Sequence, residues 1–341
     1  MSAGRPMSVG RAGSALLEVR DLVTRFPAAG GDLPVVDRVS FDLERGEVLA
    51  LVGESGSGKS MTALSILRLV PKPGRVDGGS VRLAGEDLLA LPVTGMRRVR
   101  GARISMIFQE PMTSLNPVVP VGAQVVEAIQ LHEPTTTADA RARTRALFAE
   151  VGIPDPDARL DAYPHQLSGG LKQRVMIAMA LSTRPEILIA DEPTTALDVT
   201  IQAQILALLR QLQRERGTAI LLITHDLGIV NELADRVAVM YAGRLVELAP
   251  RRTLLADPLH PYTQGLLRSI PALSRAGDRL PEIPGTVPPP DRWPPGCRFA
   301  TRCPRRFEPC HDVPPIELAP AAGRQVWCHD VERALREEGD T

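Results

Sequence analysis

The segment Gly53–Ser60 (GESGSGKS) constrains this chain more than any other. It fits the pattern G-x-x-x-x-G-K-[ST], follows the apolar run EVLALV, and precedes a run with helical spacing at 61–70. Strand, glycine-rich turn and helix in this order form a loop whose backbone N–H groups point at phosphate oxygens, and the helix N-terminus adds a favourable dipole. A chance match in a Gly/Ser-rich loop is the alternative, and the flanking strand and helix argue against it. The segment therefore predicts a nucleotide-phosphate site.

The residue types inside this loop each have a chemical reason. Glycines let the backbone curl around phosphate, Lys59 is expected between the β- and γ-phosphates of ATP, and the Ser60 hydroxyl is expected to coordinate Mg²⁺. The residues predicted to bind phosphate are Gly53, Ser55, Gly56, Ser57, Gly58, Lys59, Ser60 and Met61.

Polar side chains follow other apolar runs of the chain. Asp191 and Glu192 come directly after ILIA, and His225 follows LLIT. At the end of a buried strand beside the loop, Asp191 suits the Mg²⁺ shell and Glu192 suits a general base that polarises the attacking water. His225 is predicted to contact the γ-phosphate. An exposed Asp-Glu turn and a structural histidine are the ordinary alternatives, and the nearby phosphate loop favours the catalytic interpretation.

The order of strand and helix patterns predicts the fold class. Alternation through 187–240 implies a parallel sheet covered by helices, helical spacing dominates 118–184, and strand-like patterns fill 16–43. The absence of an internal repeat predicts one nucleotide-binding unit. The helices expected are Gln124–Gln130, Ala138–Val151, Leu171–Thr183 and Ile201–Arg214; the strands include Ser80–Leu83, Ile187–Ala190, Ala219–Ile223 and Val237–Met240.

Composition limits the function classes and the location. A formal net charge of zero and 3% aromatic residues disfavour binding to nucleic acid. No run reaches the roughly 20 apolar residues that span a bilayer, and residues 1–14 lack the apolar segment of a secretory signal and are interpreted as a flexible leader. We therefore expect a cytoplasmic protein whose membrane channel, if it serves transport, is another chain.

All four cysteines fall near the C-terminus, after a proline-rich stretch at 281–295. Their spacings of five, six and seventeen residues match no common zinc finger and contain no C-x-x-C pair, and a cytosolic location disfavours disulfides. Four thiolates suit Zn²⁺ or an iron–sulfur cluster, whereas four inert buried thiols are the other possibility. His311 and His329, each beside a cysteine, could serve as zinc ligands. The cysteines are Cys297, Cys303, Cys310 and Cys328.

Together with these motifs, Leu167-Ser168-Gly169-Gly170 resembles the signature of the ATP-binding cassette (ABC) ATPases. The resemblance covers the chain from about residue 16 onward. It implies an α/β fold with a RecA-like, phosphate-loop NTPase parallel sheet, an N-terminal antiparallel β subdomain, an inserted α-helical subdomain near 112–184, and a cassette over 15–258.

The resemblance also implies head-to-tail pairing of two cassettes in which Ser168, Gly169 and Gly170 complete the partner's ATP site, with Asp198 in the D-loop. By the same resemblance Gln109 binds Mg²⁺ and links it to the helical subdomain, and Phe26 stacks on adenine, a strand-core role being the alternative for Phe26.

Several longer stretches are similar to the oligopeptide/dipeptide importer branch of that family. They are IFQEPMTSLNP, AYPHQLSGGLKQRVMIAMAL and HPYTQGLL, although Leu171 stands where glutamine is frequent. The segment GCRFATRCPRRFEPC…VWCH resembles the C-terminal extension of peptide importers, in some of which the equivalent cysteines hold a [4Fe–4S] cluster. The resemblance thus implies a C-terminal extension over 259–341 with a four-cysteine [4Fe–4S] site, zinc being the alternative.

The function implied is ATP hydrolysis that energises import of dipeptides or oligopeptides. The partners implied are a second, non-identical ABC ATPase subunit, two transmembrane permease subunits and an external substrate-binding protein, with this chain peripheral on the cytoplasmic face of the membrane. Import of nickel or another small solute stays open. A soluble ABC protein acting on DNA or ribosomes is disfavoured by the single cassette and the lack of basic excess, and an iron–sulfur sensor without hydrolysis is disfavoured by Lys59, Asp191 and Glu192.

Overall fold

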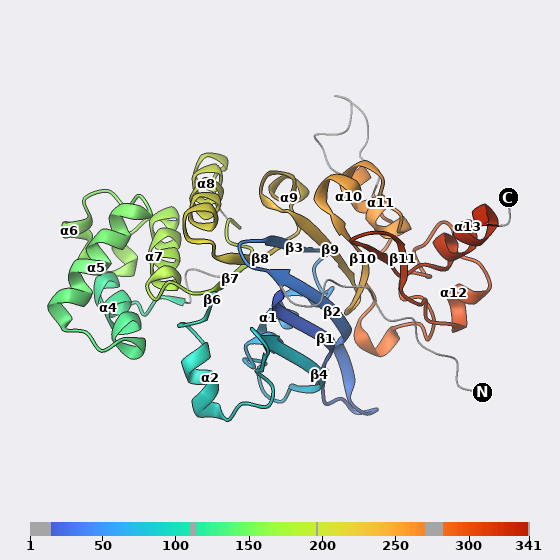
Figure 1. The fold of residues 1–341 in the computed structure, drawn as a ribbon, viewed down its shortest axis with the longest axis horizontal. Helices are drawn as coiled ribbons and strands as arrows, with labels where there is room; N and C mark the ends of the chain where they lie inside the picture. The colour runs from blue at the N-terminus through green and yellow to red at the C-terminus, as the bar shows by residue number, and fades with distance from the viewer. Residues whose placement is uncertain (1–14, 110–113, 196, 270–281, 340–341) are drawn as a thin grey trace.

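A central sheet of eight strands organises the chain (Figure 1). The structure is a computed structural model that describes residues 15–109, 114–195, 197–269 and 282–339. The strand order is β11–β12–β10–β9–β3–β8–β7–β6, in which β9, β3, β8, β7 and β6 are parallel and β10, β12 and β11 are antiparallel. The bounds are β3 Val48–Val52, β6 Ile104–Ile107, β7 Ile187–Asp191, β8 Ala219–Thr224, β9 Arg236–Tyr241, β10 Arg244–Pro250, β11 Leu318–Ala321 and β12 Arg324–Val326.

The central parallel strands are largely apolar because both faces of the sheet are covered. Every residue of β3, β7 and β8 is buried, as expected for strands under helices on one side and a second layer on the other. On one face, Leu188, Ile220 and Leu222 pack with Leu209 of helix α8 (Val199–Arg216). The apolar runs at these positions therefore predicted their strands correctly.

A second, antiparallel sheet covers the other face. Its order is β2–β1–β4–β5, with bounds β1 Ala15–Phe26, β2 Leu33–Glu44, β4 Arg75–Leu83 and β5 Glu86–Asp87. Helix α1 (Lys59–Ile66) lies between the two sheets, where Ile66 joins Leu17 of β1 and Leu51 of β3 in one core cluster. A parallel sheet with an N-terminal antiparallel sheet confirms the predicted fold class.

Helix α1 ends four residues before the predicted stop at residue 70. Arg68 takes the left-handed conformation with φ 52°, and the Leu69 N–H returns to the Leu64 carbonyl at 2.7 Å. The Arg68 guanidinium bonds the carbonyls of Leu88 and Leu91, which holds this reversal in place. The helical spacing read to residue 70 was therefore wrong over its last four residues, where the chain reverses at Arg68.

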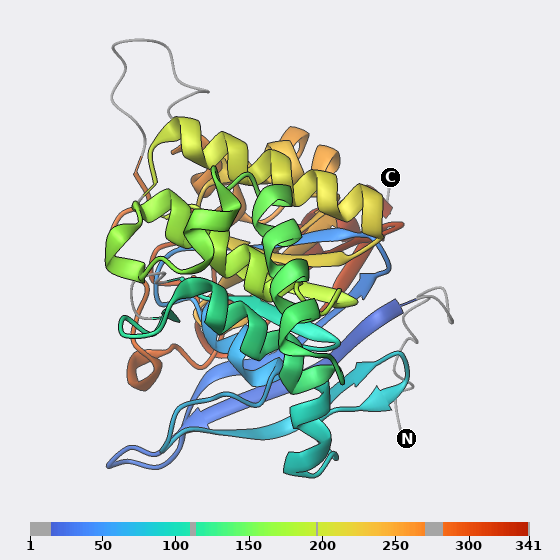
Figure 2. The same ribbon diagram turned by 90° about the vertical axis from the view of Figure 1, so that its left-hand side faces the viewer.

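A group of helices stands at the β6 edge of the sheet (Figures 1 and 2). Thr136 caps α5 by accepting the Asp139 N–H at 3.1 Å, and Ser168 caps α7. The helices differ from the predicted spans by one to three residues at most ends. Their bounds are α2 Val93–Val99, α4 Val121–His132, α5 Thr137–Glu150, α6 Pro156–Leu160 and α7 Gly169–Leu181, followed by α9 Leu227–Leu233 beside α8.

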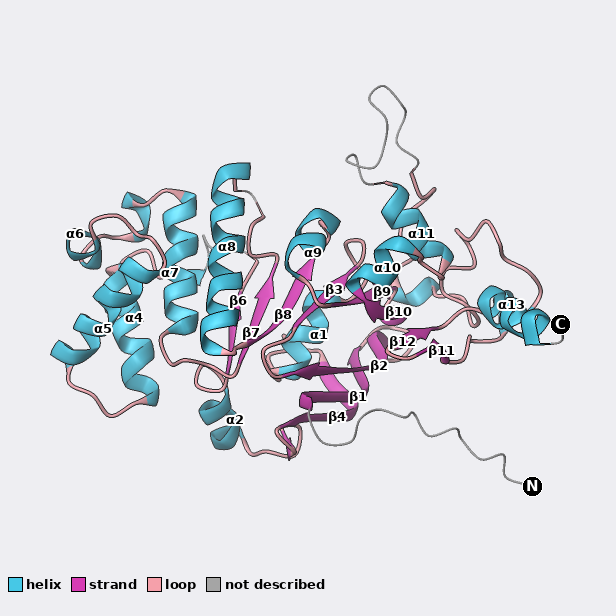
Figure 3. Cartoon of the chain, turned by 45° about the horizontal axis from the view of Figure 1, so that its top comes forward, coloured by secondary structure: helices cyan, strands magenta, loops and turns pink. Residues whose placement is uncertain are grey.

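The C-terminal part continues the central sheet (Figure 3). Strand β12 pairs with β10, and the Trp327 N–H donates to the Val246 carbonyl at 3.0 Å. Beneath this joint the Arg324 guanidinium lies 3.4 Å from the fully buried Glu247 carboxylate. The helices here are α10 Arg251–Ala256, α11 Pro261–Arg268, α12 Pro309–Asp312 and α13 His329–Gly339, with a 3₁₀ turn at Pro290–Arg292. A second 3₁₀ turn, Pro164–Gln166, precedes α7.

Two sequence predictions fall on residues that the structure does not describe. The leader predicted at 1–14 lies outside the described residues, as does Pro281 at the start of the proline-rich stretch. Among the described helices, none combines the length and the apolar character needed to cross a membrane.

Candidate active site

The segment Gly53–Ser60 joins the end of β3 to the start of α1. Two glycines of this loop are packed so closely that neither position has room for a side chain. A Cβ on Gly53 would lie 2.2 Å from the Met240 carbonyl oxygen, and one on Gly58 would lie 2.8 Å from the Val35 carbonyl oxygen. Both glycines also have positive φ, at 153° and 101°. The neighbouring β9–β10 turn holds the loop, because the Gly243 N–H donates to the Ser57 carbonyl at 2.8 Å.

The remaining predicted phosphate ligands lie along the same loop. Ser55 and Gly56 are exposed at its tip, whereas Ser57 is buried. Ser60 and Met61 stand in the first turn of α1, and Met61 packs on the core between the sheets. The loop tip is therefore open to a ligand while its base is fixed.

Lys59 is buried and directed at its own loop. Its ammonium donates to the carbonyls of Gly53 at 2.8 Å and Glu54 at 3.0 Å. Burial lowers the pKa of Lys59, and the charges of Glu192, Asp191 and Glu54 oppose that shift without cancelling it. A phosphate oxyanion in the loop would offer this ammonium stronger, charge-assisted bonds than the carbonyls do.

Asp191 and Ser60 form a pair suited to a hard cation. Asp191 ends β7 with 3% exposure, and the Ser60 hydroxyl donates to Asp191 Oδ1 at 3.0 Å. Burial raises the pKa of Asp191, the Ser60 hydrogen bond lowers it, and the Glu192 charge raises it, so that the pKa stands above its ordinary value. One carboxylate and one hydroxyl, both oxygen donors, fit Mg²⁺ bound together with nucleotide phosphates.

The Glu192 carboxylate contacts polar side chains that follow the ends of the parallel strands β6, β7 and β8. Its Oε1 lies 3.0 Å from His225 Nδ1, and its Oε2 accepts from the Thr195 hydroxyl at 2.9 Å and from Gln109 Nε2 at 3.1 Å. Its backbone takes φ 47°, and its N–H donates to the Ile223 carbonyl at 2.9 Å. The structure thus brings Glu192, His225 and Gln109 together, and the Gln109 amide bonds the Glu192 carboxylate.

Glu192 is ionised near neutral pH. Burial raises the pKa of Glu192, but hydrogen bonds from His225 and Thr195 and the charges of His225 and Lys59 together outweigh burial, so the pKa lies below its ordinary 4.5. An ionised carboxylate with 13% exposure and an oxygen directed at His225 can accept a proton from a bound water.

This lowered pKa predicts how stability depends on pH. A depressed folded pKa contributes stability that is present above the unfolded pKa near 4.5 and lost as pH falls through the folded value. We expect urea unfolding from pH 7 to pH 3 to show a larger loss of stability in wild type than in Glu192→Gln below about pH 4.5. Parallel pH curves for the two proteins would contradict the hydrogen-bonded, ionised state of Glu192.

The other predicted site residues lie on different elements. Phe26 ends β1, half-buried, and a Cβ on Gly74 would meet its ring at 2.5 Å, so the ring lies directly on the Gly74 backbone. Ser168 precedes α7 and accepts the Leu171 N–H at 3.4 Å, and Asp198 caps α8 by accepting the Ile201 N–H at 2.9 Å. Gly169 and Gly170 open α7, and a Cβ on Gly170 would lie 2.9 Å from the Ile201 side chain.

Comparison with known proteins places this geometry in a family. Residues 36–195 match the family described as ABC transporter, and residues 246–310 match the one described as oligopeptide/dipeptide transporter, C-terminal region. The oligopeptide transport ATP-binding protein AppD of Bacillus subtilis (strain 168) is 51% identical over 92% of this chain and 96% of its own length. The chain belongs to the ABC transporter family of ATP-binding proteins. The predicted family and the predicted ABC ATPase activity are therefore confirmed.

Two further similarities extend over most of this ABC protein. The dipeptide transport ATP-binding protein DppD of Haemophilus influenzae is 49% identical over 96% of this chain and 98% of its own length. The structure of cbiO1 from Clostridium perfringens, part of the ABC transporter complex cbiONQ, is 28% identical, with a TM-score of 0.61 over 72% of this chain and 92% of that one.

The four cysteines are free thiols in the extension. The Cys297 N–H donates to the Cys310 carbonyl at 2.9 Å, which sets these two backbones side by side. Burial raises the pKa of Cys297 to about 12 and that of Cys328 to about 11, and repulsion from other thiolates adds to both shifts. Within the described ranges, which include all four cysteines, no three His, Cys, Asp or Glu side chains form a group that could hold a metal ion. The structure therefore does not support the predicted [4Fe–4S] cluster.

His329, which the sequence offered as a possible zinc ligand, contacts other protein groups in this arrangement. His329 Nε2 lies 2.8 Å from the Val313 carbonyl, and its Nδ1 lies 3.5 Å from Glu332. Both ring nitrogens of His329 thus have protein partners.

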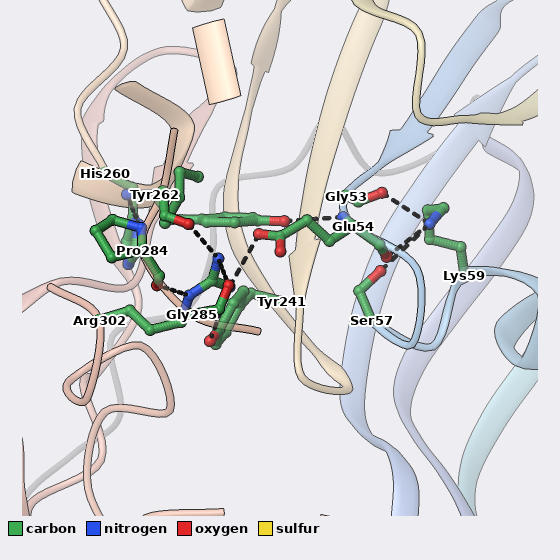
Figure 4. A network of polar contacts seen from close by, with 11 residues as sticks. Gly53, Glu54, Ser57, Lys59, Tyr241, His260, Tyr262, Pro284, Gly285 and Arg302 are labelled. Carbon is green, nitrogen blue, oxygen red and sulfur yellow. Dashed lines mark hydrogen bonds and ion pairs between the residues drawn. The ribbon is translucent and has the colours of Figure 1, made fainter. Parts of the chain in front are cut away.

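The sequence prediction missed three residues that contact the phosphate loop or belong to it. Glu54 lies inside the loop motif at a position that any residue type can fill, and Tyr262 and Arg302 reach it from the extension (Figure 4). Tyr262 stands in HPYTQGLL, which the sequence offered only as a family resemblance. Arg302 had no signal beyond its place next to a cysteine.

Proposed function

We propose that this chain is the ATP-hydrolysing subunit that energises import of dipeptides or oligopeptides through a multi-subunit ABC transporter. The match of residues 246–310 to the oligopeptide/dipeptide transporter C-terminal region carries the substrate class. The relatives named above are an oligopeptide and a dipeptide transport ATP-binding protein, which supports the same class. Import of nickel or another small solute is the alternative cargo, and a soluble ABC ATPase without a transporter is the alternative function.

In this proposal the loop residues bind the phosphates of ATP. The residues are Gly53, Ser55, Gly56, Ser57, Gly58, Lys59, Ser60 and Met61, and Phe26 stacks on adenine. Ser60, Asp191 and Gln109 hold Mg²⁺, which when bound neutralises charge on the β- and γ-phosphates. The bond between Ser60 and Asp191 supports the first two ligands.

Glu192 acts as the general base in this proposal. Its ionised carboxylate accepts a proton from, and orients, the water that attacks the γ-phosphate. His225 and Thr195 hold that carboxylate in place through their hydrogen bonds, and the exposed His225 ring is free to contact the γ-phosphate as well. Lys59 supplies positive charge to the phosphates from within the loop.

A second ABC ATPase subunit completes each site. Ser168, Gly169 and Gly170 of α7 act on the ATP held by the partner, and Asp198 lies at the same interface. The signature residues lie at the start of α7, which stands apart from α1 in Figures 1 and 3, and this supports action on another chain's nucleotide. Two transmembrane permease subunits and an external substrate-binding protein complete the transporter, with this chain peripheral on the cytoplasmic face of the membrane.

We also propose the domain division predicted above. Residues 15–258 form the ATP-binding cassette, with a helical subdomain near 112–184, and residues 259–341 form the extension. The group of helices α4–α7 beside the β6 edge supports the helical subdomain.

Dipeptide uptake tests the proposed transport. In cells that encode this chain, deletion of its gene is expected to abolish uptake of a labelled dipeptide, and the wild-type gene is expected to restore it while Lys59→Ala does not. Nickel uptake is measured in parallel. If the deletion strain lost nickel uptake and kept peptide uptake, nickel would be the cargo. If it took up both normally, the proposed transport function would be refuted.

For the four cysteines we propose a [4Fe–4S] cluster, with Zn²⁺ as the alternative. Four thiols within one extension, with Cys297 and Cys310 side by side, support a shared ligand, and the side chains would have to draw together to bind it. We expect anaerobically purified protein to carry about four irons and visible absorption, and Cys303→Ser to lose most of both. One bound zinc per chain would instead support the Zn²⁺ alternative. Protein without bound metal would refute a metal site at the four cysteines.

A further inference from the structure

Arg302 of the extension is a buried arginine that reaches the phosphate loop (Figure 4). Its side chain is 6% exposed, and Nη1 donates to Glu54 Oε1 at 3.0 Å. The same Nη1 lies 3.5 Å from the Tyr241 hydroxyl of β9. Nε and Nη2 donate to the carbonyls of Pro284, Ile283 and Gly285 at 2.8, 3.1 and 3.1 Å. One guanidinium therefore ties a loop of the extension to the phosphate loop.

Tyr262 of α11 holds the same loop residue, Glu54, through its hydroxyl. The Glu54 N–H donates to the Tyr262 hydroxyl oxygen at 2.9 Å. The Tyr262 ring is fully buried and lies 4.7 Å from the Tyr241 ring and 5.3 Å from the Phe299 ring, centroid to centroid. The Glu54 carbonyl, at the other end of this residue, accepts from Lys59. The residue that bonds the Lys59 ammonium is thus fixed from the extension.

A second arginine of the extension reaches the turn that supports the loop. Arg298 bonds the Ala242 carbonyl and the Asp37 carboxylate, and its guanidinium lies 3.7 Å from the centre of the Trp293 ring. The next residue of that turn, Gly243, donates to Ser57 of the phosphate loop. Arg298 and Arg302 both lie in the segment Cys297–Cys303, so a displacement of that segment would move both contacts.

We propose that Arg302 and Tyr262 are positioning residues for the phosphate loop, which make ATP binding depend on the C-terminal extension. They hold the Glu54 main chain and carboxylate from outside the cassette and so fix where Lys59 meets the nucleotide. A loop that is already ordered loses less conformational freedom when it closes around phosphate, and the affinity for nucleotide rises accordingly. This inference rests on the proposed function, in that the ligand of the loop is ATP.

Substitutions at the two residues separate positioning from folding. Tyr262→Phe removes the acceptor of the Glu54 N–H and keeps the ring packing; we expect its Kd for a fluorescent ATP analogue with Mg²⁺ to rise roughly threefold. Arg302→Ala is expected to raise that Kd about tenfold, and Arg302→Lys, which can keep the ion pair with Glu54, is expected to recover part of the loss. Arg305→Ala is the matched control, because Arg305 lies in the same extension and bonds Asp330 and Gln264.

The full chain is used for every variant, and melting temperature is recorded beside affinity. A lower melting temperature with wild-type affinity in both Tyr262→Phe and Arg302→Ala would overturn the proposal, because the contacts would then serve only stability. An equal loss of affinity in Arg305→Ala would overturn it as well. If wild type itself bound no nucleotide, the proposed ATP site would fail, and this result is distinct from variants that bind like wild type. If Arg302→Ala does not fold, the Kd of Tyr262→Phe alone decides between positioning and stability.

Discussion

Replacing Lys59 with alanine is expected to abolish detectable binding of MgATP at micromolar nucleotide. The Lys59 ammonium is buried in the loop, where it donates to the carbonyls of Gly53 and Glu54 and lies 3.5 Å from the Ser57 hydroxyl, so its charge stands where the phosphates are expected to bind. A hydrogen bond to a charged group contributes about 1.5–3 kcal/mol, and losing two of them on the β- and γ-phosphates raises Kd at least about hundredfold. Titration with a fluorescent ATP analogue measures the change.

A matched control separates loss of the site from loss of a positive charge. Lys72 is exposed in the turn after α1, and Lys72→Ala is expected to bind like wild type. The folded state of Lys59→Ala is checked by its melting curve, since removal of a buried ammonium also removes a desolvation cost. Wild-type affinity in a folded Lys59→Ala protein would refute the assignment of the phosphate loop.

Replacing Glu192 with glutamine is expected to keep ATP binding and to slow hydrolysis at least about hundredfold. Glutamine has the size of glutamate and keeps an oxygen that can accept the bonds of Thr195 and Gln109. It cannot take a proton from the attacking water, so ATP stays bound and the dimer of cassettes stays closed. Phosphate release measures the rate, and light scattering in MgATP measures the dimer.

The control for this substitution is a carboxylate elsewhere on the cassette. Glu215 is exposed on α8, and Glu215→Gln is expected to hydrolyse ATP at the wild-type rate. Turnover of Glu192→Gln at the wild-type rate would remove Glu192 as the base and leave its cluster with His225 as a structural feature.

Local patterns were enough to predict the ATP-binding region. The loop Gly53–Ser60 carries its glycine requirements within eight residues, and β7 and β8 are apolar runs that end where polar side chains begin. Because parallel strands place their carboxyl ends at one edge of the sheet, Asp191, Glu192 and His225 had to lie near each other. The structure adds the bond between Gln109 and Glu192, which depends on side-chain geometry that no spacing encodes.

The joint between the extension and the cassette could not be predicted in the same way. Strands β11 and β12 are short and join the sheet through β10 by non-local pairing. The bond between Arg302 and Glu54 spans 248 positions of the chain, and neither residue belongs to a pattern that predicts the other. The sequence suggested an extension set apart by a proline-rich linker, whereas packing places its arginines beside the phosphate loop.

Calorimetric titration of the purified wild-type chain with MgATP decides whether the Gly53–Ser60 loop binds ATP. We expect saturable binding of one nucleotide per chain, with heat that disappears in Lys59→Ala and persists in Glu192→Gln. Titration without saturable heat, or identical binding curves for wild type and Lys59→Ala, would contradict ATP binding at this loop.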